Sequence, residues 1–190
     1  MVGIDEVGRG PIAGPVAVGV FLMDKKHQKL LKGIKDSKAL GKKGREIWHK
    51  KILELKKQKI VDFKVSYVSS EIIDKKGIAY SIRFAMQKSL SSLKISPQKV
   101  SVLLDGSLYA PMEYKYQKTI IKGDEKEIVI AAASVVAKIS RDALMEKLAK
   151  KYPKYPFEKH KGYGTKAHYS RVKKHGFSKI HRRSFLKGIS

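Results

Sequence analysis

Residues 3–16 read Gly-Ile-Asp-Glu-Val-Gly-Arg-Gly-Pro-Ile-Ala-Gly-Pro-Val, and this stretch decides how the chain is organised. A short apolar run carries two adjacent acids and then enters a turn made of glycines, one arginine and prolines. With 42 Lys and Arg against 17 Asp and Glu, the chain does not need acids here for solubility. We interpret Asp5 and Glu6 as metal ligands. We interpret Gly8, Arg9 and Gly10, the Gly-Arg-Gly loop, as a segment that lies close to a substrate backbone.

The length and composition favour one globular domain over residues 1–190. A chain of 190 residues can bury a full core. It has no cysteine, which excludes disulfides and thiolate metal sites. No apolar run reaches the ~18 residues that span a bilayer, and the N-terminus lacks the features of a secretory signal. We therefore expect a cytoplasmic protein with no membrane partner.

The net charge of +25 is the strongest global feature of the sequence. Such an excess of cations favours polyanionic partners, because binding releases condensed counterions. A lysine-rich surface that reflects biased composition or adaptation to heat is an equally good explanation. Charge alone does not separate DNA from RNA, or either from a membrane surface.

The hydrophobic pattern predicts a mixed α/β sheet with helices packed on it. The first two strands are separated by little more than a turn, so we expect them to be antiparallel neighbours. Strands are predicted over residues 1–7, 14–23, 61–67, 99–105 and 115–121. Helices are predicted over residues 42–57, 79–93, 127–150 and 166–175, with short helices within 27–40 and before Gly77.

Three acidic positions share one local pattern. Asp5-Glu6, Asp105 and Asp124 each lie at or just beyond the end of a predicted apolar strand, with glycine close by. Strand ends are where the sites of open α/β sheets gather. Asp and Gly also mark ordinary turns, and that explanation suffices for any one position. Three such positions in so basic a chain favour a common site.

The chemistry of that site follows from charge. Four carboxylates held together raise one another's pKa unless cations fill the space between them. Two divalent ions balance four carboxylates, and all-oxygen ligation suits Mg²⁺ or Mn²⁺. Such a pair can activate water and stabilise the leaving oxygen of a phosphodiester, with Asp5 as the expected bridging ligand. Neighbours on a regular strand point to opposite faces, so Glu6 must leave that alternation or act through its backbone.

The six histidines show no zinc pattern, and we expect structural or surface roles for them. For His160, which stands beside Lys161, Gly162 and Tyr163, a place near the substrate is left open.

The chain resembles the type 2 ribonucleases H, specifically the bacterial ribonuclease HII family. The resemblance rests on blocks that span nearly the whole chain in the family's order. The blocks are residues 3–11, 36–38, 104–106, 123–124, 131–138, 141–142, 160–165 and 181–185. Only four residues precede Asp5, which favours HII over HIII, since HIII carries a separate N-terminal substrate-binding domain.

The resemblance implies a ribonuclease H-like fold, a five-stranded mixed sheet flanked by helices with a helical C-terminal part. It implies an endonuclease that cleaves the RNA strand of RNA/DNA hybrids. It also implies incision on the 5′ side of ribonucleotides embedded in duplex DNA, leaving 3′-hydroxyl and 5′-phosphate ends, as ribonucleotide excision repair requires. We expect a monomer in which residues 151–190 contribute to substrate binding.

The resemblance also implies roles for individual residues. The catalytic and metal-binding acids are Asp5, Glu6, Asp105 and Asp124, whereas Asp142 is assigned a structural role. The substrate-binding residues are Gly8, Arg9, Gly10, Lys38 and Tyr163. The Gly-Arg-Gly backbone is expected to contact the 2′-hydroxyl and the adjacent phosphate, and Tyr163 to stack on the next sugar. Lys161, Arg182 and Arg183 are weaker candidates for phosphate contacts.

Two other functions fit part of the evidence. A non-catalytic basic nucleic-acid-binding protein on the same fold explains the charge equally well but leaves the acids without a purpose. A two-metal nuclease that acts on DNA alone explains the acids but not the Gly-Arg-Gly loop.

Overall fold

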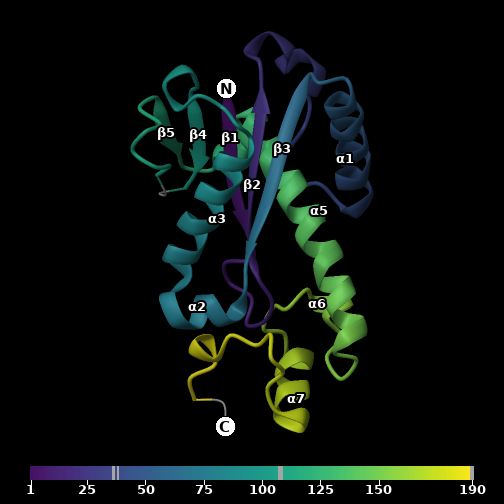
Figure 1. Ribbon diagram of the computed structural model, residues 1–190. Helices are drawn as coiled ribbons and strands as arrows, with labels where there is room; N and C mark the ends of the chain where they lie inside the picture. Colours follow the sequence, from purple (N-terminus) through teal and green to yellow (C-terminus); the bar gives the residue numbers. More distant parts are fainter. Residues whose placement is uncertain (36, 38, 107–108, 189–190) are drawn as a thin grey trace.

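The computed structural model describes residues 1–35, 37, 39–106 and 109–188 (Figure 1). The strands are β1 (Val2–Val7), β2 (Val16–Met23), β3 (Val61–Val68), β4 (Val102–Asp105) and β5 (Gln117–Ile120). The α-helices are α1 (Lys42–Lys57), α2 (Ser70–Lys76), α3 (Ile78–Ser92), α4 (Gly123–Lys126), α5 (Ile128–Lys151), α6 (Phe157–His160) and α7 (Lys166–His175). Short 3-10 helices cover Lys25–Leu31, Pro97–Lys99 and Arg183–Phe185. The predicted elements are thus confirmed, with shifts of a few residues at their ends.

The five strands form one mixed sheet in the order β3-β2-β1-β4-β5. β1 and β2 are antiparallel, as predicted, and β3 continues this antiparallel half. β1, β4 and β5 run parallel to one another. The carboxyl ends of three strands therefore meet at a single edge of the sheet.

Helices cover both faces of the sheet (Figure 1). On one face, α2 and α3 pack against alternate residues of β1 and β2, among them Val2 and Val18. On the other face, α5 and α1 enclose a second core that includes Phe21 and Ile52. None of the described helices is long and apolar enough to cross a membrane.

Two glycines let α5 lie unusually close to the sheet. A Cβ on Gly3 would lie 2.2 Å from the backbone of Val129, and one on Gly19 would lie 2.6 Å from the carbonyl oxygen of Ala133. Neither position has room for a larger residue, because a side chain there would meet the backbone of α5, which cannot move aside as a flexible side chain can. The alanine-rich N-terminal half of α5 is thereby fixed against β1 and β2.

The C-terminal segment, from α6 to residue 188, packs across the end of the sheet where β1 stops and β2 begins (Figure 1). Ala13 forms an antiparallel bridge with His181. A small third core that contains Ala13, Met145 and Phe157 joins this segment to α5.

Candidate active site

Three of the four predicted acids come together at the carboxyl ends of the parallel strands. The parallel pairing of β1 with β4 runs to Ile4 opposite Leu104, and Asp5 and Asp105 are the next residues of the two strands. Asp124 lies in the first turn of α4, just after β5. The topology therefore gathers acids that are far apart in the sequence.

Asp5 and Glu6 lie on opposite faces of the sheet. Asp5 is paired across the strands with Gly19, which faces α5, and Glu6 is paired with Val18, which packs on the α3 side. The strand neither bends nor ends between them, so the alternation that the sequence analysis identified is kept. Asp5 shares its face with the site, and Glu6 approaches the site from the other face.

Asp5 is a strongly perturbed acid. Its side chain is buried, and burial raises its pKa to about 8. A hydrogen bond with Ser134 opposes this rise, and the charges of Glu6, Asp105 and Asp124 add to it. Burial also raises the pKa of Glu6, against the attraction of Arg9, whose guanidinium lies 3.6 Å from the carboxylate. The acids thus lie close enough together to repel, which a bound cation would relieve.

Backbone amides hold two of the carboxylates in place. The Glu6 amide donates to Asp5 Oδ1 at 2.8 Å, and the Gly123 amide donates to Asp105 Oδ1 at 2.7 Å. The second bond ties the end of β4 to the start of α4, which carries Asp124.

The donor set fits a hard divalent cation, because every candidate ligand is a carboxylate. Within the described ranges, no three His, Cys, Asp or Glu side chains form a group that could hold a metal ion as they stand. Asp5, Asp105 and Asp124, with Glu6 from the other face, are the residues that would hold one.

The Gly-Arg-Gly loop follows β1 directly. Its first and third positions hold glycine for different structural reasons. Gly8 has φ +87°, and a Cβ there would lie 2.1 Å from the Arg141 side chain, so the protein itself demands glycine. Gly10 is exposed, and nothing in the described structure lies within 4 Å of a Cβ placed on it. The fold does not explain the glycine at position 10, whereas close approach of a ligand does.

Tyr163 lies on a loop that is bonded to the same turn. The Ile12 and Ala13 amides both donate to the Gly162 carbonyl, at 2.9 and 3.2 Å. The Tyr163 side chain is 43% exposed, which leaves its ring accessible to a substrate. The two predicted substrate-binding segments are therefore joined, although about 150 residues separate them in the sequence.

Comparisons with known proteins agree with this geometry. The family model described as Ribonuclease HII matches residues 2–187. The chain belongs to the ribonuclease HII family. A curated ribonuclease HII from Caldicellulosiruptor bescii is 44% identical over 187 residues, which cover 98% of this chain and 86% of that protein.

Solved structures show the same fold. The ribonuclease H2 from Pyrococcus horikoshii OT3 superposes with a TM-score of 0.72 at 27% identity, over 98% of this chain and 99% of that one. A ribonuclease HIII, Bst-RNase HIII in complex with Mn²⁺, gives 0.66 at 18% identity over 97% of this chain and 63% of that one. The ribonuclease H-like fold is thereby confirmed. As a member of the ribonuclease HII family, the chain is a ribonuclease H enzyme.

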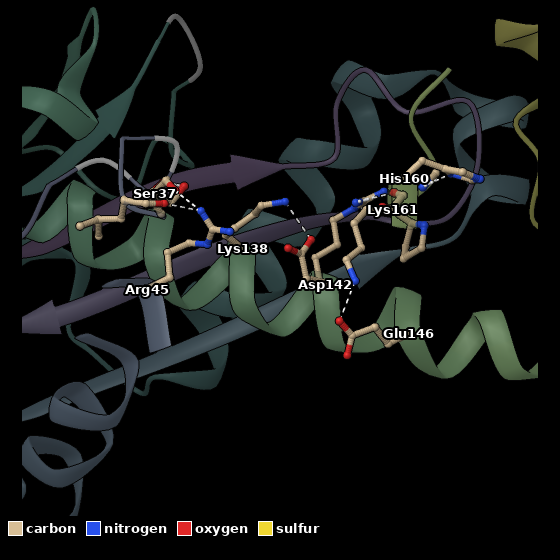
Figure 2. Close-up of polar contacts among 12 residues, drawn as sticks. Ser37, Arg45, Lys138, Asp142, Glu146, His160 and Lys161 are labelled. Atoms are coloured by element: carbon tan, nitrogen blue, oxygen red, sulfur yellow. Dashed lines mark hydrogen bonds and ion pairs between the residues drawn. The ribbon is translucent and has the colours of Figure 1, made fainter. Parts of the chain in front are cut away.

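In this member of the ribonuclease HII family, Lys38 lies outside the described residues. Its neighbour Ser37 is buried, and the hydroxyls of Ser37 and Ser134 are hydrogen-bonded at 2.8 Å. Arg45 donates to the Ser37 carbonyl at 2.7 Å (Figure 2). Because Ser134 also bonds to Asp5, this segment is anchored beside the acids. Ser134 does not stand out in the sequence, because it lies within an otherwise apolar stretch of α5.

The ion pairs along α5 continue from this anchor toward the Tyr163 loop (Figure 2). Lys138 pairs with Asp142 at 2.9 Å, which agrees with the structural role expected for Asp142. Lys161 pairs with Glu146 at 2.6 Å, so part of its charge is already neutralised.

One expectation about phosphate contacts is wrong. Arg182 was a candidate for binding phosphate, but its side chain is fully buried and cannot reach a substrate backbone. Arg141 is buried to a similar degree. Burial lowers the pKa of Arg182 to about 9, with the charge of Arg141 adding to the effect. In a chain with 42 Lys and Arg, nothing in the sequence marks these two as interior residues.

Three histidines form a buried network behind Tyr163. His168 Nδ1 lies 2.8 Å from the Tyr163 carbonyl, which only accepts, so this nitrogen carries the proton. The Ser178 amide donates to His181 Nδ1 at 2.9 Å, so His181 is protonated on Nε2 and donates to His168 Nε2 at 3.1 Å. His160 stacks on His168 with ring centroids 4.1 Å apart. The expected structural role of the histidines is thus met at these positions.

Proposed function

We propose that this chain hydrolyses the RNA strand of RNA/DNA hybrids and incises duplex DNA on the 5′ side of an embedded ribonucleotide. The products carry 3′-hydroxyl and 5′-phosphate ends. The observation that carries the proposal is the meeting of the strand-end acids with the exposed Gly-Arg-Gly loop and Tyr163. Metal-binding acids alone do not distinguish the phosphodiesters of RNA from those of DNA. The adjoining loops supply contacts that distinguish ribose from deoxyribose.

The proposed cofactor is a pair of Mg²⁺ or Mn²⁺ ions held by Asp5, Glu6, Asp105 and Asp124. When bound, such ions supply an activated water and stabilise charge on the leaving oxygen. Asp5 is the best placed of the acids to serve both ions, because it is buried among the other three. The Mn²⁺ complex of the HIII neighbour supports this choice of metal.

The substrate-binding residues proposed for this site are Gly8, Arg9, Gly10, Lys38 and Tyr163. The backbone amides of the loop read the 2′-hydroxyl, which is the group that distinguishes RNA from DNA. Exposed Arg9 lies beside Glu6 and adds positive charge near the scissile phosphate. The single domain acts as a monomer, and residues 151–190 carry the Tyr163 loop and widen the basic surface. The cytoplasmic location remains a prediction from the sequence.

An incision assay tests the function directly. A duplex with one central ribonucleotide should be cut once, on the 5′ side of that nucleotide, in Mg²⁺ or Mn²⁺. The same duplex made wholly of deoxynucleotides is the control and should stay intact. Equal cleavage of both would indicate a nuclease for DNA alone. Cleavage of neither, with tight binding of both, would indicate the non-catalytic nucleic-acid-binding alternative.

The metal site has an independent test in thermal melting. A ligand that binds only the folded state stabilises it by about 2.7 kcal/mol at one hundred times its dissociation constant. Mg²⁺ or Mn²⁺ should therefore raise the melting temperature of the wild-type chain. Asp5→Asn should remove most of that increase, and an equal increase in both proteins would contradict the assignment.

A further inference from the structure

Arg182 is one of the two arginines whose side chains are buried in the described structure. It is fully buried, and its described hydrogen bonds go to backbone carbonyl oxygens of the turn after β1. Nε donates to the Gly14 carbonyl at 2.9 Å, Nη1 to the Arg9 carbonyl at 2.9 Å, and Nη2 to the Gly8 carbonyl at 2.7 Å. One side chain thus holds both ends of the turn that contains the Gly-Arg-Gly loop.

These bonds fix the direction of two peptide planes. In a planar trans peptide, the N–H points away from the C=O of the same unit. The carbonyl of Gly8 belongs to the same unit as the Arg9 amide, and the carbonyl of Arg9 to the same unit as the Gly10 amide. When Arg182 draws both carbonyls inward, both amides point outward.

The two amides have no use within the described structure. No hydrogen bond among the described residues uses the Arg9 or Gly10 N–H, and both residues are exposed. Open space at the Gly10 Cα leaves room for a ligand to approach. Two adjacent outward amides form a donor pair suited to a hydroxyl and a phosphate oxygen.

We propose that Arg182 is a positioning residue for sugar recognition: it holds the Gly8 and Arg9 carbonyls inward, and so presents the Arg9 and Gly10 amides to the ribonucleotide. This inference rests on the proposed function of the Gly-Arg-Gly loop. Arg182 does not touch the substrate, and it acts only through the loop backbone. Its rigid fork reaches all three carbonyls at once, which the single ammonium of a lysine cannot do.

Arg141 does not duplicate this role. It donates to the carbonyls of Pro15 at 2.9 Å, Lys161 at 3.0 Å and Ala13 at 3.5 Å. Its bonds tie the far side of the turn to the Tyr163 loop, and none of them goes to the Gly8 or Arg9 carbonyl. Arg182 alone among the described side chains donates to those two carbonyls.

The test measures binding in the absence of cleavage. In an Asp5→Asn background, we compare dissociation constants for a fluorescent duplex with one ribonucleotide and for the all-deoxy duplex, in Mg²⁺. The Asp5→Asn protein should prefer the ribonucleotide duplex. Adding Arg182→Gln should reduce that preference by about five-fold, the value of one lost hydrogen bond to the 2′-hydroxyl. Binding of the all-deoxy duplex should weaken only by the loss of the amide contact to phosphate, which both duplexes share.

Two further variants separate positioning from stability. Arg182→Lys keeps the charge and part of the bonding, and should retain an intermediate preference. Ile52→Ala removes buried volume from the core between the sheet and α1, and should lower the melting temperature without changing the preference.

Each outcome decides a definite point. If the Asp5→Asn protein shows no preference, the proposed sugar recognition fails, and the role of Arg182 fails with it. If that preference is present and survives Arg182→Gln, only the role of Arg182 fails. If both Arg182 variants lose their folded circular-dichroism signal, or if Ile52→Ala loses the preference equally, Arg182 serves stability alone and the inference is overturned.

Discussion

At the scale of single residues, the two adjacent acids of β1 are not equivalent. Asp5 is buried on the α5 face beside Asp105, whereas Glu6 lies on the opposite face and pairs with Arg9. Asp5→Asn should abolish cleavage and leave binding of all-deoxy duplex largely intact, because it removes a metal ligand and no phosphate contact. Glu6→Gln should lose less cleavage activity than Asp5→Asn, with kcat about ten- to a hundred-fold below that of the wild type. Single-turnover assays of the two variants measure this, and an equal loss would contradict the difference drawn from the strand register.

The two glycines of the loop give a second contrast at this scale. Gly8→Ala should destabilise the fold by about 1–3 kcal/mol, because a Cβ meets Arg141 and φ is positive. Gly10→Ala should unfold at the same denaturant concentration as the wild type, since no described atom opposes it. It should still lose cleavage of the embedded ribonucleotide, because the added methyl group holds the sugar away. Wild-type activity of Gly10→Ala would show that no substrate approaches this position.

The residues that sequence reasoning found and missed differ in a physical way. The placement of Asp5, Asp105 and Asp124 at one edge of the sheet was predictable because acids at strand ends stand out in a basic chain, and their role as metal ligands stays a prediction. Arg182 and Ser134 were not, because their roles depend on burial and on partners far away in the sequence. Periodicity shows which face of an element is apolar, and it cannot show that a cation is enclosed by carbonyls contributed from another segment.

At the scale of elements, the histidine network links the C-terminal segment to the Tyr163 loop. Burial lowers the pKa of His160 and of His181 to about 4 in the folded chain, against about 6.5 when unfolded. Between these values the unfolded state binds more protons, so stability rises with pH. Stability is fully present above about pH 6.5 and should be lost progressively as the pH falls toward 4.

Urea unfolding at a series of pH values measures this effect. His181→Gln is the informative variant, because an amide N–H can still donate to His168 but does not titrate in this range. Its stability should vary less between pH 6.5 and 4 than that of the wild type. If the free energy of unfolding of His181→Gln depends on pH as steeply as that of the wild type, the acid sensitivity arises elsewhere in the molecule.

The helices and strands themselves were largely predictable. α1 matches its predicted range of residues 42–57, and the side chains of Ser69 and Thr165 cap α2 and α7. The close contact of α5 with the sheet was not predictable, since Gly3 and Gly19 look like ordinary strand interruptions in the sequence. Only the register shows that both face helix backbone.

At the scale of the whole molecule, the net charge of +25 and the recognition of the 2′-hydroxyl should contribute independently to the affinity for nucleic acid. Lys and Arg contacts to phosphate release counterions, and log affinity falls by about 0.9 per phosphate neutralised on duplex DNA. An uncharged contact to a 2′-hydroxyl releases none. Plots of log affinity against log salt for the ribonucleotide and all-deoxy duplexes should therefore be parallel lines. Anisotropy titrations of the Asp5→Asn protein test this, and different slopes would mean that recognition of the sugar recruits further cations.

The bridge between Ala13 and His181, together with the hold of Arg182 on residues 8–14, has a consequence for biosynthesis. The ribosome makes the end of β1 that carries Asp5 and Glu6 first, and Arg182 and His181 only some 170 positions later. A nascent chain can form most of the sheet and gather its acids while the turn after β1 still lacks its support. Loops closed over so long a separation form late. Under the proposed function, selectivity for RNA would be the last property that the growing chain acquires.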